Sequence, residues 1–175
     1  MPFGEFTPQQ VLQQAARMMP SFDLIVEQAS SIYETPPFPD ARQPNFANAV
    51  IKVKTKHDAE NVLRACFGIE RRFNRERDER WGARTLDIDL LAYNEIVLPS
   101  LEVWYEIAQA DDVMVTDLIL PHPRLHKRRF VLEPLMEIAP HWVHPILGNA
   151  LGSLCKQIKA AADVDDIKRL SLKLL

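Results

Sequence analysis

Two aspartates, Asp87 and Asp89, lie one residue apart in an otherwise mainly apolar segment, 85–91 (TLDIDLL). Alternate side chains of a strand share a face, so both carboxylates are predicted to project together, opposite the leucine and isoleucine side chains. Mg²⁺ prefers carboxylate oxygens combined with water and substrate phosphate, and a carboxylate pair can bridge two ions in phosphoryl chemistry. A solvated strand face is the alternative interpretation of this pattern taken alone.

Arginines are concentrated directly before the aspartates, interleaved with acidic residues: Arg71, Arg72, Arg75, Arg77, Arg80 and Arg84. Arginine suits bidentate recognition of phosphate, although a mutually neutralised surface loop would have the same composition. A second basic cluster contains no acidic residue: His122, Arg124, His126, Lys127, Arg128 and Arg129. Such a cluster favours anion binding. Paired carboxylates and flanking cations together indicate metal-assisted phosphoryl transfer.

A stiff aromatic and proline-rich segment, 33–38 (YETPPF), precedes Phe46 and Asn48, and Phe130 follows much later. Prolines fix the φ angle and have no backbone N–H, so carbonyl groups of this segment are left free to accept hydrogen bonds. Aromatic faces, a side-chain amide and fixed backbone groups are what a flat, amide-rich heterocycle requires. The alternative is that Phe46 and Phe130 are ordinary core residues.

The composition is that of a globular chain, with 175 residues, a net charge of −3, 47% hydrophobic and 26% charged residues. This length predicts one domain over 1–175. The five glycines form neither a GxGxxG nor a GxxxxGK[ST] motif, which excludes the glycine-rich phosphate loops. Two isolated cysteines, no long apolar run and no basic leader predict a cytoplasmic protein without a membrane span. The small net charge argues against a general nucleic-acid binder.

Apolar spacing predicts the elements that must position these groups. Helices are expected over 8–19, 58–73, 103–110, 130–138 and 150–162, with Thr7 as the first N-cap. Strands are expected over 22–33, 49–55, 85–93 and 167–174. Their order favours an α+β fold, with helices packed on one antiparallel or mixed sheet.

The segment 80–91 (RWGARTLDIDLL) closely resembles the R-W-G-P-R-T-x-D-x-D signature of the 6-hydroxymethyl-7,8-dihydropterin pyrophosphokinase family. Segments 120–125 (LPHPRL) and 128–135 (RRFVLEPL) resemble the second signature of that family. Residues 33–37 and 46–48 match its pterin-loop pattern. The resemblance covers about residues 30–140, with several motifs in the family order.

The resemblance implies a single ferredoxin-like α+β domain in folate biosynthesis. The implied reaction moves the β,γ-pyrophosphate of ATP, the co-substrate, onto the hydroxymethyl oxygen of the pterin and releases AMP. It also implies a functional link to dihydropteroate synthase and no nucleic-acid partner. Two Mg²⁺ ions would be held by Asp87 and Asp89.

The family positions also assign roles to individual residues of this sequence. The implied catalytic residues are Asp87, Asp89, Arg75, Arg84 and His122. The implied ATP-binding residues are Glu70, Arg75, Arg77, Trp81, Arg84, His122 and Arg128. The implied pterin-binding residues are Thr35, Pro36, Pro37, Phe38, Phe46, Asn48 and Phe130.

Some positions depart from the family pattern. Ala83 replaces the signature proline, and the segment 98–120 is longer than usual, which predicts an insertion. Residues 1–4 (MPFG) stand where family members end an apolar strand, so that first strand is expected to be missing. A catalytically impaired homologue that still binds pterin or nucleotide is therefore one alternative. Another is a different metal-dependent phosphoryl-transfer enzyme or nuclease that uses the same aspartates.

Overall fold

A computed structural model describes residues 6–37, 44–73, 85–110, 118–161 and 167–175 of the chain. The helices are α1 (Pro8–Met18), α2 (Ala59–Arg72), α3 (Leu101–Gln109), α4 (Arg129–Ile138) and α5 (Leu151–Ala161), with short 3₁₀ turns η1 (Met19–Phe22) and η2 (Leu125–Lys127). The strands are β1 (Ile25–Ala29), β2 (Ser31–Thr35), β3 (Phe46–Asn48), β4 (Ile51–Lys54) and β5 (Lys168–Lys173).

The strands form two small antiparallel sheets, one of β1 and β4 and one in the order β3-β2-β5. β1 and β2 follow each other with Ser30 between them, and the same residue faces the junction of β3 and β4. The Ser30 N–H donates to the Val50 carbonyl over 2.9 Å, and the Val50 N–H donates to Ser30 Oγ over 2.9 Å. A buried serine therefore joins the two sheets where the strand direction changes.

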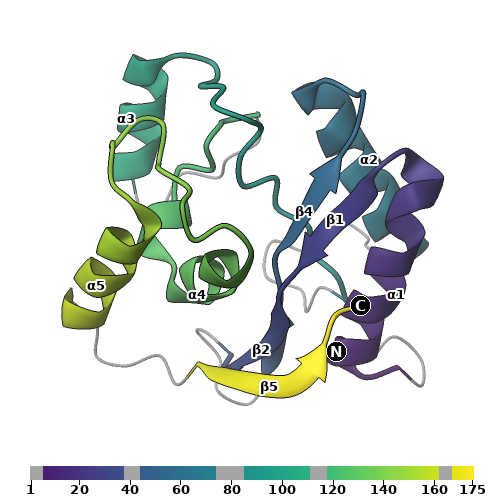
Figure 1. Cartoon of the computed structure of the whole chain (residues 1–175). Helices are drawn as coiled ribbons and strands as arrows, with labels where there is room; N and C mark the ends of the chain where they lie inside the picture. The colour runs from purple at the N-terminus through teal and green to yellow at the C-terminus, as the bar shows by residue number, and fades with distance from the viewer. Residues whose placement is uncertain (1–5, 38–43, 74–84, 111–117, 162–166) are drawn as a thin grey trace.

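One hydrophobic core lies between α1, α2 and the sheet of β1 and β4 (Figure 1). Both helices begin at side-chain caps, of which the sequence predicts the first, Thr7. Thr7 and Gln10 form a reciprocal capping box, and Asp58 accepts a hydrogen bond from the Asn61 N–H over 2.8 Å. Caps fix where each helix starts, so its apolar stripe meets the sheet in one register.

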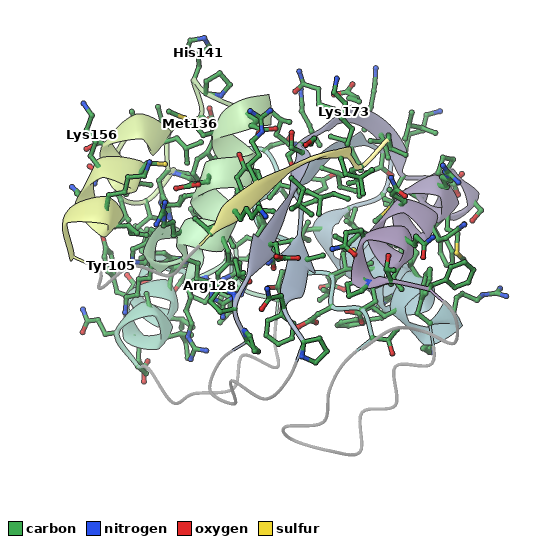
Figure 2. The ribbon with its side chains drawn as sticks, turned by 90° about the horizontal axis from the view of Figure 1, so that it is seen from below. Tyr105, Arg128, Met136, His141, Lys156 and Lys173 are labelled. Atoms are coloured by element: carbon green, nitrogen blue, oxygen red, sulfur yellow. The ribbon has the colours of Figure 1, made fainter. Side chains whose placement is uncertain are left out.

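A second core lies between α4 and α5 on the other side of the strands. Seen from below, α4 and α5 flank β2 and β5 on one side and α1 flanks them on the other (Figure 2). α3 forms a further hydrophobic cluster, in which the fully buried Trp104 packs with Ala108 and Ile119. None of the helices in the described ranges combines the length and apolarity needed to cross a lipid bilayer.

The structure confirms the α+β class and the antiparallel pairing, with every expected helix present and its ends shifted by a few residues at most. The strands form two sheets and not the one sheet expected, because the chain changes direction at Ser30. The strand expected over 22–33 begins only at Ile25 and is divided in two at Ser30. The expected strand over 49–55 is β4, and the three-residue β3 before it was not predicted. The terminal strand expected over 167–174 is β5.

The prediction of a strand over 85–93 is wrong. Residues 85–93 carry no strand assignment and have no ladder partner in the described ranges. Some of their backbone groups bond elsewhere: the Ile88 N–H donates to Glu70 and the Leu91 carbonyl accepts from the His122 N–H. Alternating apolar residues indicate an extended segment, but a strand also requires a neighbour with free backbone groups.

Candidate active site

The carboxylates of Asp87 and Asp89 lie on the solvent side of the extended segment 85–93 (the aspartate segment below). Leu86, Ile88 and Leu90 pack into the core of α1 and α2, as the alternation predicts. The Ile88 N–H, between the two aspartates, donates to Glu70 Oε1 over 2.7 Å, and Glu70 is buried on α2. The buried carboxylate therefore fixes the backbone from which both aspartates project.

Asp89 faces a second segment of the chain, the basic loop over residues 121–128. Its Oδ2 lies 3.4 Å from Arg128 Nη1 and 4.0 Å from His122 Nε2. The His122 N–H donates to the Leu91 carbonyl over 2.8 Å, which joins the basic loop to the aspartate segment. A carboxylate, a guanidinium and an imidazole from two distant parts of the sequence thus form one cluster.

The imidazole of His122 is held in a single tautomer. Its Nδ1 accepts the Arg124 N–H over 3.1 Å, so the proton of the neutral ring is on Nε2, toward Asp89. Burial lowers the pKa of His122 below its ordinary value, and Arg128 and Arg124 lower it further, against the opposing effect of Asp89. A neutral ring that presents an N–H can donate a hydrogen bond to an anion in this cluster.

The second basic cluster is less free for anion binding than its sequence suggests. Arg124 Nη2 donates to the Ala110 carbonyl over 3.2 Å, and Lys127 Nζ donates to the Ala108 carbonyl over 2.7 Å. Arg129 pairs with Glu133 on α4, with Nε 2.6 Å from Oε1. His122 and Arg128 are the members that face the aspartate segment.

Three of the predicted pterin-binding side chains, those of Thr35, Phe46 and Asn48, lie on one face of β2 and β3. The antiparallel register places Thr35 opposite Phe46 and Tyr33 opposite Asn48, and directly opposed residues share a face. Asn48 Nδ2 donates to Thr35 Oγ1 over 3.0 Å, which orients the amide. Phe46 is 38% exposed, so its ring is available to a ligand as well as to the sheet.

This face of the sheet is turned toward α4. Tyr33 on β2 donates its hydroxyl proton to Glu137 on α4 over 2.7 Å. At the N-terminal end of the same helix, the Arg128 guanidinium lies 5.7 Å from the centre of the Phe130 ring. In Figure 2, Arg128 lies at the end of α4 away from His141. α4 therefore connects the predicted pterin face with the cluster around Asp89.

The donor set of the aspartate segment fits Mg²⁺. Two solvent-facing carboxylates supply the hard oxygen ligands that the ion prefers, and the remaining ligands of such sites are water and phosphate oxygen. No group of three or more His, Cys, Asp or Glu residues suitable for a metal ion occurs among the described residues. A carboxylate pair completed by a bound phosphate is consistent with both observations.

Several predicted site residues lie outside the described ranges: Phe38, Arg75, Arg77, Trp81 and Arg84. Of the others, Pro36 is exposed and Pro37 half-buried directly after β2. Glu70 is 1% exposed and bound to the Ile88 N–H, so the structure places it beneath the aspartates. Its contact with ATP stays a prediction.

Two supports of the site were not recognised in the sequence. Glu137 accepts from the Ser31 N–H over 2.8 Å and from the Tyr33 hydroxyl, and its Oε1 lies 2.7 Å from Arg169 Nε on β5. Trp104 Nε1 donates to the Pro121 carbonyl over 2.7 Å. The partners are separated by 17 to 106 residues, so no local spacing reveals the hydrogen bonds.

Comparison with known proteins gives the family. Residues 5–140 match the family described as 7,8-dihydro-6-hydroxymethylpterin-pyrophosphokinase. The chain is 35% identical to the 2-amino-4-hydroxy-6-hydroxymethyldihydropteridine pyrophosphokinase of Synechocystis sp., over 78% of this chain and 62% of that protein. It is 37% identical to the protein of the same name from Methylorubrum extorquens, over 81% of this chain and 76% of that protein. The Folic acid synthesis protein fol1 of Schizosaccharomyces pombe is 36% identical over 77% of this chain and 16% of its own length.

The match spans the aspartate segment, the basic loop, the β2–β3 face and the whole of α4, which are the parts that the geometry brings together. Sequence similarity and geometry therefore coincide on the same residues. The chain belongs to the 7,8-dihydro-6-hydroxymethylpterin-pyrophosphokinase family.

Proposed function

We propose that this chain transfers the β,γ-diphosphate of ATP to the hydroxymethyl oxygen of 6-hydroxymethyl-7,8-dihydropterin and releases AMP. The observation that carries the proposal is the cluster of Asp89, Arg128 and His122 beside the β2–β3 face. It combines a carboxylate for metal, a guanidinium and an imidazole N–H for phosphate, and a flat-ring site on adjoining elements. Family membership supports the same substrates, since the relatives carry the name of this activity.

In the proposed complex, Asp87 and Asp89 hold Mg²⁺ with the triphosphate. The bound ion would neutralise charge on the phosphate oxygens and orient the β-phosphorus for attack. Arg128 lies close enough to Asp89 to contact the same phosphates, and its planar guanidinium suits bidentate binding. His122 would donate a hydrogen bond from its Nε2–H to a phosphate oxygen.

On the side of Arg128 away from the triphosphate, the pterin would lie between the β2–β3 face and the start of α4. The Asn48 amide offers a donor and an acceptor to the ring edge, and Phe130 offers an aromatic face. Pro36, Pro37 and Phe46 border the same end of β2 and β3. These are the roles that the family motif predicts for them.

The reaction is a displacement at phosphorus, with little covalent work for the protein. The hydroxymethyl oxygen forms a bond to the β-phosphorus, the bond to the α,β-bridging oxygen breaks, and AMP leaves with that oxygen. The hydroxyl proton passes to solvent or to a phosphate oxygen. His122 already carries its proton on Nε2, so it stabilises charge and does not remove this proton. Positioning and charge neutralisation therefore account for most of the rate enhancement.

Two other functions make different predictions. A binding-only homologue would bind ATP or pterin without releasing AMP. A different phosphoryl-transfer enzyme or nuclease would turn over nucleotide or nucleic acid in the absence of pterin. A cytoplasmic location and a functional link to dihydropteroate synthase follow from the proposed pathway and stay predictions.

The deciding experiment follows AMP in a mixture of the chain, MgATP and 6-hydroxymethyl-7,8-dihydropterin. We expect AMP that depends on the pterin, and a loss of at least about 100-fold in Asp89→Asn. Asp23→Asn is the matched control, because Asp23 is exposed and lies in a left-handed conformation that asparagine tolerates. ADP as product, or AMP formed equally without pterin, would contradict the proposal.

A further inference from the structure

The basic loop over residues 121–128 is fixed from the side opposite the aspartates by α3. At the C-terminal end of α3, the Ala108 carbonyl accepts from Lys127 Nζ over 2.7 Å, and the Ala110 carbonyl accepts from Arg124 Nη2 over 3.2 Å. The last carbonyls of a helix lack partners within the helix and carry partial negative charge. The end of α3 is therefore a natural acceptor for the cations of this loop.

The middle of α3 contacts the other end of the loop. Trp104 is 1% exposed, and its Nε1–H donates to the Pro121 carbonyl, the group directly before His122. The indole packs on Ala108 and Ile119 and lies 5.6 Å from the ring of His126, measured between ring centres. Both ends of the loop are thus attached to one short helix.

Other contacts of the loop run to the proposed phosphate site, while Leu125 packs into the core of α4 and α5. His122 is bonded through its N–H to Leu91 and through Nδ1 to the Arg124 N–H, and Arg128 lies beside Asp89. Arg124 therefore links the two sides: its backbone orients the His122 ring, and its side chain is bound to α3. A shift of the loop away from α3 would move Nε2 of His122 and the guanidinium of Arg128 together.

We propose that α3 is a positioning element for the triphosphate of ATP, with Trp104 and Lys127 as the positioning residues. Neither side chain needs to touch substrate; each holds the basic loop at the distance from Asp89 that lets His122 and Arg128 meet the same phosphates. The inference rests on the proposed function and extends it to a helix within 98–120, the segment expected to be an insertion. Transfer at phosphorus depends mainly on positioning, so a displaced loop weakens both ATP binding and turnover.

The test compares two pairs of variants. Trp104→Phe keeps an aromatic ring and removes the N–H that bonds to Pro121, whereas Tyr105→Phe alters the exposed neighbouring ring. Lys127→Gln removes the cation at the end of α3, whereas Lys156→Gln removes an exposed cation on α5, far from Arg128 in Figure 2. Lys127→Arg tests rescue, since it restores a cation at the same place.

Three quantities are measured below the unfolding transition: Kd for Mg²⁺ with α,β-methylene-ATP, KM for each substrate, and amide hydrogen exchange across residues 120–128. We expect Trp104→Phe and Lys127→Gln to raise Kd and KM for the nucleotide about tenfold, the scale of one lost hydrogen bond. The KM for the pterin stays within about twofold, and exchange at the His122 amide becomes faster. Lys127→Arg recovers most of the nucleotide affinity, and both controls match the unaltered chain.

A purely structural role for α3 would give a different result. Trp104→Phe and Lys127→Gln would then lower Tm but leave the nucleotide Kd and the exchange across the loop unchanged in the folded protein, which overturns the inference. An unaltered chain that binds no nucleotide and forms no AMP overturns the proposed function and this inference with it. If the unaltered chain is fully active and Trp104→Phe and Lys127→Gln bind nucleotide as tightly as it does, the role of α3 is overturned and the proposed function stands.

Discussion

Arg128 Nη1 lies 3.4 Å from Asp89 Oδ2, although 39 residues separate the two along the chain. Arg128 is also close to the ring of Phe130, so one guanidinium lies beside both halves of the proposed site. A guanidinium next to a carboxylate neutralises it in the protein alone, and can bind phosphate oxygen when the substrate is present. We therefore regard this pair as the point where nucleotide and pterin sites meet.

The first prediction concerns the guanidinium of Arg128. Arg128→Lys keeps the charge and loses the planar fork, so we expect KM for ATP to rise about tenfold, and about 100-fold in Arg128→Gln. The KM for the pterin should change less than about threefold, because the cation contributes little to the Phe130 face. Steady-state kinetics with each substrate varied in turn provides the measurement. Arg64→Gln, an exposed arginine on α2, should behave as the unaltered chain.

How much of this site could be predicted depends on whether the information is local. The alternation around Asp87 and Asp89 correctly predicts that both face solvent while Leu86 and Ile88 pack into the core. The same alternation wrongly predicts a strand, because pairing depends on a neighbour that the local sequence does not specify. Helix caps are local as well, which is why α1 begins directly after Thr7, the predicted cap.

The partners of the second basic cluster are the clearest case of information that is not local. Its sequence contains no acidic residue, which favoured anion binding for the whole cluster. The structure gives Arg124 and Lys127 carbonyl partners at the end of α3 and gives Arg129 a carboxylate one turn along α4. The Glu137 hydrogen bonds to β2, 104 and 106 residues away, are equally invisible in the sequence.

The second prediction concerns the pterin face. Asn48→Ala removes the amide that Thr35 orients, and we expect the KM for the pterin to rise about 10- to 100-fold, because the ring edge loses paired hydrogen bonds. The KM for ATP should stay within about twofold. Fluorescence titration of the pterin and steady-state kinetics give the two values. Equal losses for both substrates would show that Asn48 supports the fold and not the pterin.

The third prediction concerns the buried carboxylate beneath the aspartates. Glu70→Ala leaves the Ile88 N–H without its partner, and we expect the free energy of unfolding to fall by about 2 kcal/mol, the scale for a buried donor left without a hydrogen bond. The kcat should also fall, since the aspartate segment loses an anchor. Urea denaturation and AMP formation measure the two effects. Glu60→Ala, an exposed position on α2, should change neither by much.

The last prediction concerns His144, which is fully buried in the cluster with Trp104 and Trp142. Burial, and after it the nearby imidazole of His126, lowers the pKa of His144 to about 4 from 6.5. At His144 the unfolded chain therefore binds a proton more readily than the folded protein. The contribution of the neutral ring to the free energy of unfolding is present above about pH 6.5 and is lost as the pH drops toward 4. The loss reaches about 3 kcal/mol near pH 4.

His144→Asn separates this effect from other acid-sensitive groups. The Ile146 and Leu147 N–H groups both donate to Nδ1 of His144, and the side-chain carbonyl oxygen of an asparagine can accept these bonds in place of Nδ1. We expect a lower free energy of unfolding at pH 7.5, because the smaller side chain leaves a cavity, but a flatter dependence between pH 6.5 and 4. Urea denaturation at several pH values measures both, with the exposed His141→Asn as the matched control. A slope equal to that of the unaltered chain would assign the acid sensitivity to groups other than His144.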